Sequence, residues 1–370
     1  MELYIYDTSL TLKGVIDEIT SFIWIRRYWS AGEFKLLVPF TTINAKLLVK
    51  KNLIMKKGDK GAAQIKYVGI SKNAQGLEEI EVQGKFVTEW LDKRIVLNQI
   101  ITTDTSQNIM YRIANENAIT PADVNRVIPL LELEESPPDL QSGAINYTSE
   151  LFISALLATE TVAKAAKLGF EIETDIKAQK HILKVYKGRD LTADQIENPP
   201  CIFSQEFDNI REQEFTNSIE NFRSSGYVGG EEKEGVERLL VEVGSTSGLD
   251  RDEIFINASD ITQTYKDGET EITMPLATYI EMLRQRGVKE LEQYAETLSF
   301  SSKINAFSNL TYKEDFDIGD RVTCVDKRWG VKINVRITEI TETYQQNKND
   351  IEVTFGESLP TLFDKINKMR

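Results

Sequence analysis

The sequence predicts a mainly β protein of the α+β class that contains several domains. Its expected architecture is two related small β-barrel modules, tube-like in form, with an inserted helix-plus-hairpin module. Strand-like alternation of apolar and polar residues fills both ends of the chain, helical spacing appears between them, and 370 residues exceed what one hydrophobic core usually serves. The composition, 41% hydrophobic and 28% charged, is that of a globular protein and not of a disordered or coiled-coil chain.

Residues 1–103 are expected to form an N-terminal β-barrel domain. Between residues 22 and 40, aromatic and β-branched residues alternate with polar ones on both sides of a turn at Gly32. Three further strand-like runs follow, NLIMKKGD, AAQIKYVGIS and LEEIEVQG, separated by Gly-Asp and Asn-Ala-Gln-Gly breaks. Short strands with regular turns are typical of a small barrel or sandwich.

Residues 104–200 are expected to form an α+β insert domain. A Thr/Asp/Ser cluster at 103–106 predicts the start of a helix. The segment 127–146 holds three prolines in acidic surroundings, which predicts an exposed connection without regular structure. A second helix is predicted over 148–168, because capping residues stand at its start, lysines near its end and a glycine just beyond. A strand pair, FEIETDI and KHILKVYKG, follows.

Two further domains are predicted after this insert. Residues 201–275 carry strand signals around the loop GGEEKEG and should form a β-rich domain. Residues 276–370 should form a helix followed by the C-terminal β-barrel module. The helix starts after Pro275, and Gly287 interrupts its apolar stripe, so either one bent helix or two short helices are predicted. A short terminal helix is predicted after Pro360.

An internal similarity relates the two barrel modules. MKKGD followed by IKYVGISKNAQGLEEIEVQG resembles DIGD followed by VRITEITETYQQNKNDIEVTFG. Each has a Gly-Asp pair, then a long hairpin with an Asn-containing tip and a closing Glu-Val and Gly. Alternation and Gly or Asn turns are also generic features of antiparallel hairpins, so a chance likeness stays open beside duplication. Comparing the strand order of the two segments tests the duplication.

Charge and targeting signals limit the function classes. The chain has 44 basic and 58 acidic residues, a net charge of -14, so a sequence-independent grip on nucleic acid is not expected. The N-terminus lacks the basic and apolar regions of a signal peptide, and no stretch reaches the roughly 18 apolar residues that a membrane span needs. The two cysteines, Cys201 and Cys324, form no metal or disulfide pattern. A protein made in the cytoplasm, without a membrane segment, is therefore predicted.

Motifs for catalysis, metal binding or cofactor binding are not expected in this chain. The only histidine, His181, lies in an alternating strand flanked by lysines, so an exposed or half-buried strand position is predicted for it. Asp315, Asp317 and Asp320 partly match a calcium loop, but Gly319 stands where a ligand belongs, which favours a Gly-Asp corner between strands. We predict no catalytic residue, no metal site and no cofactor.

One aromatic and basic cluster is a candidate interface. Trp, Tyr and Arg dominate protein interfaces, and five such residues stand close together between positions 24 and 29. Trp24 is better explained as a core residue of a strand. The candidate interface residues are Arg26, Arg27, Tyr28 and Trp29, although these arginines could equally be solvated neighbours of core aromatics.

Four separated blocks together resemble a known family. They are SFIWIRRYWSAGEFKLLVP; GKFVTEWLDKRIV; FSQEFDNIREQEFTNSIENFRSSGYVGGEEKEGVERLLVEVG with GLDRDEIFINASDI; and DFDIGDRVTCVDKRWGVKINVRITEITETY with DIEVTFGESLPTLFDKI. In this order they are similar to the ReqiPepy-type siphovirus tail protein family. The likeness spans nearly the whole chain, although the insert between about 104 and 200 contributes little to it.

The resemblance implies a phage or prophage baseplate hub, located in the tail tip of the virion and assembled in the cytoplasm of a Gram-positive host. Such a hub is a homotrimer, in which two similar barrels per subunit make a pseudo-sixfold ring that continues the hexameric tail tube. The implied partners are the distal tail protein and tail tube on one side and tail spike or fibre proteins on the other. DNA would pass through the ring without specific binding, and the resemblance implies no catalytic residues.

Three functional hypotheses therefore stand beside one another. The first is the structural tail hub, which is not an enzyme. The second is a tail-associated cell-wall hydrolase that uses an Asp/Glu pair, for which the sequence marks no two facing carboxylates. The third is a carbohydrate-binding receptor module for host attachment, which a β-rich architecture with exposed aromatic residues permits.

Overall fold

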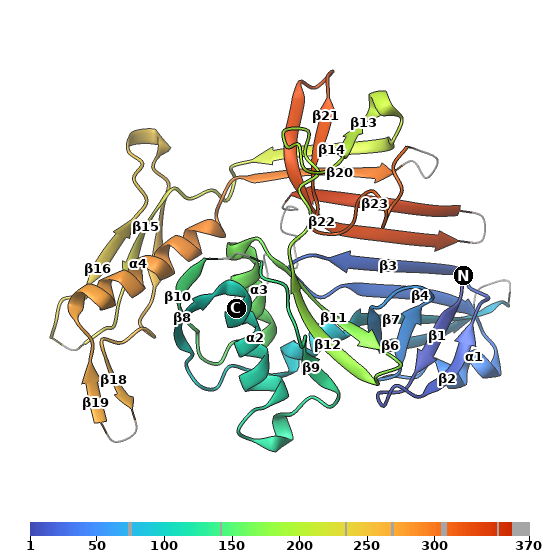
Figure 1. The fold of residues 1–370 in the computed structure, drawn as a ribbon, viewed down its shortest axis with the longest axis horizontal. Helices are drawn as coiled ribbons and strands as arrows, with labels where there is room; N and C mark the ends of the chain where they lie inside the picture. Colours follow the sequence, from blue (N-terminus) through green and yellow to red (C-terminus); the bar gives the residue numbers. More distant parts are fainter. Residues whose placement is uncertain are drawn as a thin grey trace. The chain divides into compact units, whose positions relative to one another are not determined.

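A computed structural model describes residues 1–72, 76–140, 143–233, 235–267, 270–304, 309–345 and 348–356. The chain divides into two compact units. Unit 1 holds the described residues of 1–214 and 300–356, and unit 2 holds those of 215–299. The fold is mainly β, as the sequence predicts (Figure 1). The terminal helix predicted after Pro360 lies outside the described residues.

The first module of unit 1 consists of seven strands and one short helix. They are β1 (Leu3–Tyr6), β2 (Leu12–Ile16), β3 (Ser21–Arg27), β4 (Glu33–Pro39), α1 (Thr42–Leu47), β5 (Leu53–Lys56), β6 (Ala62–Lys72) and β7 (Glu78–Phe86). The strand-like runs recognised in the sequence therefore become strands. Alternation puts Phe22, Trp24, Phe34 and Leu36 on one buried face, which confirms Trp24 as a core residue.

The second module of unit 1 is built from two separated parts of the chain. Its elements are β13 (Ile202–Ser204), a 3-10 turn η4 (Gln205–Phe207), β14 (Ile210–Ser218), β20 (Thr297–Ile304), β21 (Arg321–Asp326), β22 (Val331–Gln345) and β23 (Lys348–Gly356). β14 and β20 run across the division between the two units. Buried aromatic rings form its core, with Phe203 in edge-to-face contact with Phe316 and 5.0 Å from Phe355 between ring centroids.

The two modules share one strand order. In one continuous sheet the neighbours run β14-β20-β23-β22-β3-β4-β7-β6-β5-β1-β2, and β21 also pairs with β22 and β13. The order β3-β4-β7-β6-β5-β1 in the first module corresponds, strand by strand, to the order β14-β20-β23-β22-β21-β13 in the second. One difference is that β1 pairs antiparallel with β5, whereas β13 pairs parallel with β21. The strand order of the two modules, which was the test of the duplication, is therefore the same except for the direction of this last pair.

The hairpins also agree residue by residue. A β-bulge interrupts β6 between Ile65 and Tyr67, and a bulge interrupts β22 between Ile337 and Glu339. Aligning the bulges places IKYVGISK over ITEITETY, and the closing strands then share the letters IEV. The Gly-Asp part of the predicted similarity is wrong, because Gly58-Asp59 connects β5 to β6 whereas Gly319-Asp320 precedes β21, the counterpart of β5.

The continuous sheet has ends, β14 and β2, within the described part of the chain. The seam between the modules is the pair β3 and β22, which lie side by side in Figure 1. Closed barrels, as the sequence predicts for each module, are not confirmed by this strand path.

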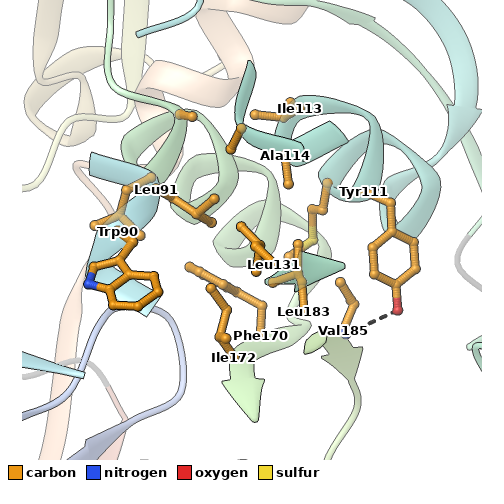
Figure 2. Packing of buried hydrophobic residues seen from close by; sticks show 14 of the residues in the cluster. Trp90, Leu91, Tyr111, Ile113, Ala114, Leu131, Phe170, Ile172, Leu183 and Val185 are labelled. Carbon is orange, nitrogen blue, oxygen red and sulfur yellow. Dashed lines mark hydrogen bonds between the residues drawn. The ribbon is translucent and has the colours of Figure 1, made fainter. Parts of the chain in front are cut away.

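The insert of unit 1 packs helices against a small sheet. Its elements are η1 (Val87–Lys93, 3-10), β8 (Ile101–Thr105), α2 (Ser106–Ala114), η2 (Asn115–Ile119, π), η3 (Val124–Arg126, 3-10), β9 (Leu131–Leu133), β10 (Ala144–Thr148), α3 (Ala155–Ala166), β11 (Gly169–Asp175) and β12 (Lys180–Tyr186). Figure 2 shows Phe170 of β11 and Leu183 of β12 packed with Leu91 of η1. The Val185 amide donates to the Tyr111 hydroxyl at 3.2 Å, which ties α2 to β12.

Two predictions for the insert are corrected. The second helix begins after Ser154, whose side chain accepts the Leu157 amide, and not at Thr148, which ends β10. The segment 127–146 is not wholly irregular, because β9 pairs in parallel with β12 and Leu131 is buried. The predicted helix start near 103–106 and the strand pair β11–β12 are confirmed.

Unit 2 is a small sheet covered by one helix. Its elements are β15 (Ser225–Gly229), β16 (Leu240–Val243), η5 (Gly248–Asp250, 3-10), β17 (Glu253–Asn257), β18 (Thr264–Asp267), β19 (Thr270–Thr273) and α4 (Leu276–Glu292). The order β16-β15-β17 makes the sheet, and β18 pairs with β19. α4 is one helix, starting after Pro275. Gly287 does not divide it; a Cβ there would lie 2.5 Å from Val228, so glycine allows close packing on the sheet.

Candidate assembly interface

The seam between β3 and β22 joins the two modules of unit 1 through backbone and charge. The strands pair antiparallel from Ser21 opposite Gln345 to Arg27 opposite Glu339. Arg27 donates to Glu339 at 2.7 Å and to Glu33 of β4, also at 2.7 Å, so one guanidinium binds carboxylates on both neighbouring strands. The cross-strand pair therefore reinforces a register that the backbone already sets.

Arg26 makes a second set of contacts behind the seam. Its guanidinium donates to Asp317 at 2.7 Å and to the Tyr312 hydroxyl at 3.0 Å, and it lies 3.9 Å from Glu171. Burial disfavours its charge, but Tyr312, Glu171 and Asp317 outweigh that effect and raise the pKa of Arg26. Arg26 therefore remains charged and connects β3 to the insert and to the loop before β21.

A buried ion pair lies next to this network. Lys56 of β5 is 2.5 Å from Glu342 of β22 and 3.5 Å from Asp59. Tyr312 and Tyr344 both donate to Glu342. Only 7% of Lys56 and 2% of Glu342 is exposed, so each charge depends on these partners for compensation.

Asp59 is the acidic group most affected by this site. Burial alone would raise its pKa, but Lys313, Arg26 and Lys56 lower the pKa of Asp59 to about 2. Lys313 lies 3.2 Å away, and the Gly61 amide donates to the carboxylate at 3.1 Å. Asp59 is therefore an anion that holds cations from both modules.

A hollow of about 430 Å³ borders these charges. It is lined by Met1, Glu2, Lys56, Lys57, Gly58, Tyr312, Lys313, Glu342 and Tyr344. Its lysines have partners within the chain: Lys57 lies 2.9 Å from Glu2, and Lys56 and Lys313 have the contacts given above. The charges that line the hollow are thus explained by contacts that join the two modules.

Tyr28 and Trp29 follow directly after the seam. Tyr28 is fully buried, and its hydroxyl donates to the Lys167 carbonyl at 3.1 Å. Its ring packs against backbone, since a Cβ at Gly169 or Gly319 would lie 2.2 or 2.4 Å from it. Trp29 is half-buried and packs against the core of the insert. Tyr28 therefore anchors the end of β3 to the insert and to the corner before β21.

The structure thus brings the four candidate interface residues together at a contact within the chain. That they contact another chain stays a prediction. The analysis of the sequence missed Lys56, Asp59 and Glu342, the charges that complete this site. A signal was present, because Glu342 lies between Ile340 and Tyr344 on one face of an alternating strand, where a carboxylate needs a partner.

His181 lies in a different environment from the one predicted. It is fully buried, because β12 places it on the same inward face as Leu183 and Val185, and Trp90 of η1 covers it edge-on with ring centroids 4.9 Å apart. Thr174 contacts Nδ1 at 2.9 Å. Burial lowers the pKa of His181 to about 4, so the ring is neutral near pH 7.

The Gly-Asp corner predicted before β21 is confirmed. Gly319 has φ +89°, and the Asp320 carboxylate accepts the Arg189 amide at 2.7 Å and the Asp317 amide at 2.9 Å. The Arg189 guanidinium adds an ion pair of 2.7 Å. Asp320 thus serves as the fixed acceptor of a turn.

Within the ranges described above, no group of three or more His, Cys, Asp or Glu residues could hold a metal ion. Cys201 and Cys324 are free and buried, and burial raises the pKa of Cys201 to about 12. None of the helices described has the length and apolar character needed to cross a membrane.

Several solved structures share this fold, among them three tail proteins. The 43 kDa tail protein of prophage MuSo2 from Shewanella oneidensis has a TM-score of 0.60 at 12% identity, covering 96% of this chain and 98% of that one. The tail protein from Neisseria meningitidis MC58 has a TM-score of 0.57 at 13% identity, covering 96% of each chain. Prophage tail protein gp18 from Listeria monocytogenes EGD-e has a TM-score of 0.54 at 10% identity, covering 100% and 98%.

The family comparison covers the whole described chain except for Met1. A search of curated protein sequences finds no match. The family of siphovirus ReqiPepy6 Gp37-like proteins matches residues 2–357, which includes both modules, the insert and unit 2. The chain therefore belongs to the family of siphovirus ReqiPepy6 Gp37-like proteins.

Proposed function

We propose that this chain is a structural subunit of a phage tail-tip hub, in which three copies form a ring of six similar modules. One observation carries the proposal: β3 and β22 join two modules of matching strand order into one continuous sheet. A subunit with two related modules matches a sixfold tail tube with only three copies. The likeness to three solved tail proteins supports the same assignment.

The proposed hub places the ring between other tail components. Its partners are the tail tube and distal tail protein on one side and spike or fibre proteins on the other, in the virion tail assembled in the bacterial cytoplasm. DNA passes through the ring without specific binding. The net charge of -14 supports this last point, because an acidic surface repels the phosphate backbone.

The solution mass of the purified chain tests the proposal. Light scattering across a concentration series should give about three times the 42.1 kDa chain mass, and negative-stain images should show rings with threefold symmetry. A monodisperse monomer across the series, both alone and mixed with the distal tail protein of the same phage, would count against the hub.

The predicted segments 1–103, 104–200, 201–275 and 276–370 remain our proposal for the domains along the sequence, although the second module takes β13 and β14 from the third segment and β20–β23 from the fourth. Limited proteolysis with mass spectrometry of the fragments tests these boundaries, because cleavage concentrates in exposed connections between compact parts. Stable fragments that end inside these segments would contradict the division.

No observation favours the two alternative functions. For a hydrolase, the buried acids of unit 1 are the natural candidates, yet Asp59, Asp320 and Glu342 each face cationic partners that hold them in structural contacts. A cleared zone on a Gram-positive cell-wall zymogram would reopen that alternative. For a carbohydrate-binding module, specific signals on a glycan array would do the same.

A further inference from the structure

The edge of β6 beyond its bulge is open in the described chain. Residues Tyr67–Lys72 pair with β7 on one side, and no described strand pairs with their other side. The matching residues of β22, Glu339–Tyr344, pair with β23 on one side and with β3 on the other. The same type of edge is therefore filled in the second module and unfilled in the first.

Exposure of the side chains shows the same contrast. Ile70 is 60% exposed and Tyr67 is 51% exposed, whereas Glu342, the counterpart of Ile70 in the bulge alignment, is 2% exposed. Leu77, which precedes β7 at the tip of this hairpin, is 65% exposed. An edge strand with unpaired backbone groups and exposed apolar residues is a template for pairing with another strand.

The strand that would fill this edge is present elsewhere in the chain. β3 fills the edge of β22, and the counterpart of β3 in the second module is β14. β14 pairs with β20 and ends the sheet, so its other edge has no strand neighbour among the described residues. Each copy of the chain thus carries one open edge of the β22 type and one open edge of the β3 type.

Charge favours pairing of these two edges. Residues 66–72 contain two lysines, which also contact Glu89 and Glu78 of their own chain at 2.7 and 3.3 Å. Ile210–Glu214, the part of β14 in unit 1, contains one arginine and two glutamates. The same asymmetry holds more widely: residues 1–100 contain 15 basic and 11 acidic residues, and the rest of the chain is strongly acidic. Opposite net charges steer unlike edges together and disfavour pairing of like edges.

We infer that β14 of one copy pairs antiparallel with Tyr67–Lys72 of the next copy, repeating between chains the β3–β22 pairing found within one chain. This inference rests on the proposed ring and names its contact between subunits. The occupant is a second copy of this chain, and the contact is head-to-tail, because β14 and β6 are different surfaces. Backbone hydrogen bonds along added strands supply the affinity.

Photo-cross-linking tests the contact. The photoreactive residue p-benzoylphenylalanine replaces Tyr67 in one variant and the exposed Val124 of the insert in a control variant. Each variant is prepared without isotope label and is mixed with ¹⁵N-labelled wild-type chain. Irradiation should cross-link position 67 to a ¹⁵N-labelled peptide that contains residues 208–219, which shows that the peptide comes from another copy. Position 124 should give no cross-link to that peptide.

The outcomes separate this inference from the ring itself. A trimer in which position 67 gives no cross-link to 208–219 overturns the β14–β6 contact and leaves the hub intact. A monomer without cross-links between copies, at any concentration and with the distal tail protein of the same phage added, overturns both.

Charge reversal gives an independent measurement. Lys66→Glu with Lys72→Glu should raise the dissociation constant of the trimer by about tenfold or more, because it makes both edges acidic. Lys177→Glu with Lys180→Glu changes the net charge equally at the β11–β12 turn and should leave that constant within about twofold. Equal effects of the two double variants would contradict the proposed contact.

Discussion

Lys56 and Glu342, 286 residues apart in sequence, form an ion pair in which 2.5 Å separates Nζ from Oε2. Lys56 belongs to β5 of the first module and Glu342 to β22 of the second. Both side chains are buried, and two tyrosine hydroxyls also donate to the carboxylate. The pair therefore couples the folding of one module to the presence of the other.

Removing one member of this pair should destabilise unit 1 strongly. Lys56→Met leaves the Glu342 carboxylate buried without its cation, and we expect a loss of about 3 to 5 kcal/mol in the free energy of unfolding. Urea denaturation followed by circular dichroism measures it. Lys35→Met is the matched control, because its pair with Glu81 is exposed and should contribute about 1 kcal/mol or less. Similar losses for both variants would contradict the assigned role.

Asp59 should make unit 1 sensitive to strong acid. Its pKa in the folded chain is about 2, below the ordinary value of 3.8, so its carboxylate stabilises the fold above about pH 4. That contribution, about 2 kcal/mol, should be lost as the pH falls from about 4 through 2. Asp59→Asn should lower stability at pH 7 and weaken the acid dependence between these values. An unchanged acid profile would show that Asp59 is not held as described.

His181 should add a dependence at milder pH. Burial lowers its pKa in the folded chain to about 4, whereas the unfolded chain has the ordinary value of 6.5. The unfolded state therefore binds the proton first, and stability, complete above about pH 6.5, should fall by about 3 kcal/mol as the pH drops to 4. Because His181 is the only histidine, its ring proton gives one NMR signal that should not titrate between pH 5 and 8. A midpoint near 6.5 would mean that the ring is solvated.

Gly319 and Gly330 make a matched pair for measuring the contact with Tyr28. Both have positive φ, +89° and +69°, so alanine is strained at each by about 1 kcal/mol. A Cβ at Gly319 would also lie 2.4 Å from the Tyr28 ring, whereas Gly330 faces open space. Gly319→Ala should lower the free energy of unfolding by about 3 kcal/mol or more, and Gly330→Ala should lower it by about 1 kcal/mol. Thermal unfolding measures both. Equal costs would show that the Tyr28 ring moves aside.

The strands and hairpins were predictable because their information is local. Alternation over six to ten residues fixes which face of β3, β6 or β22 is buried, and that pattern can be read from one segment alone. The start of α3 was not predictable in this way. Thr148, Ser149 and Ser154 can all cap a helix, and the choice depends on Ser149, whose hydroxyl accepts the Ile100 amide at 2.8 Å.

The candidate interface was predictable only in part, because a local sequence pattern shows its arginines and not their distant partners. The arginines of β3 were visible as a cluster, but two of their carboxylate partners, Asp317 and Glu339, lie in the loop before β21 and on β22, 291 and 312 residues away. A charged residue within an alternating strand indicates that a partner of opposite charge is needed, but it does not indicate which residue is that partner. The burial of His181 likewise depends on Trp90, which comes from another element and has no signature in the strand around the histidine.

The connection between β14 and β20 has a consequence for how such proteins diversify. In the first module the equivalent strands, β3 and β4, are joined by residues 28–32; in the second, residues 219–296 occupy the same connection. The sheet accepts either a short turn or most of a folded unit at that point, because both ends of the connection emerge from neighbouring strands. A unit of a different size can therefore occupy this junction without a change in the strand order of the sheet that carries it.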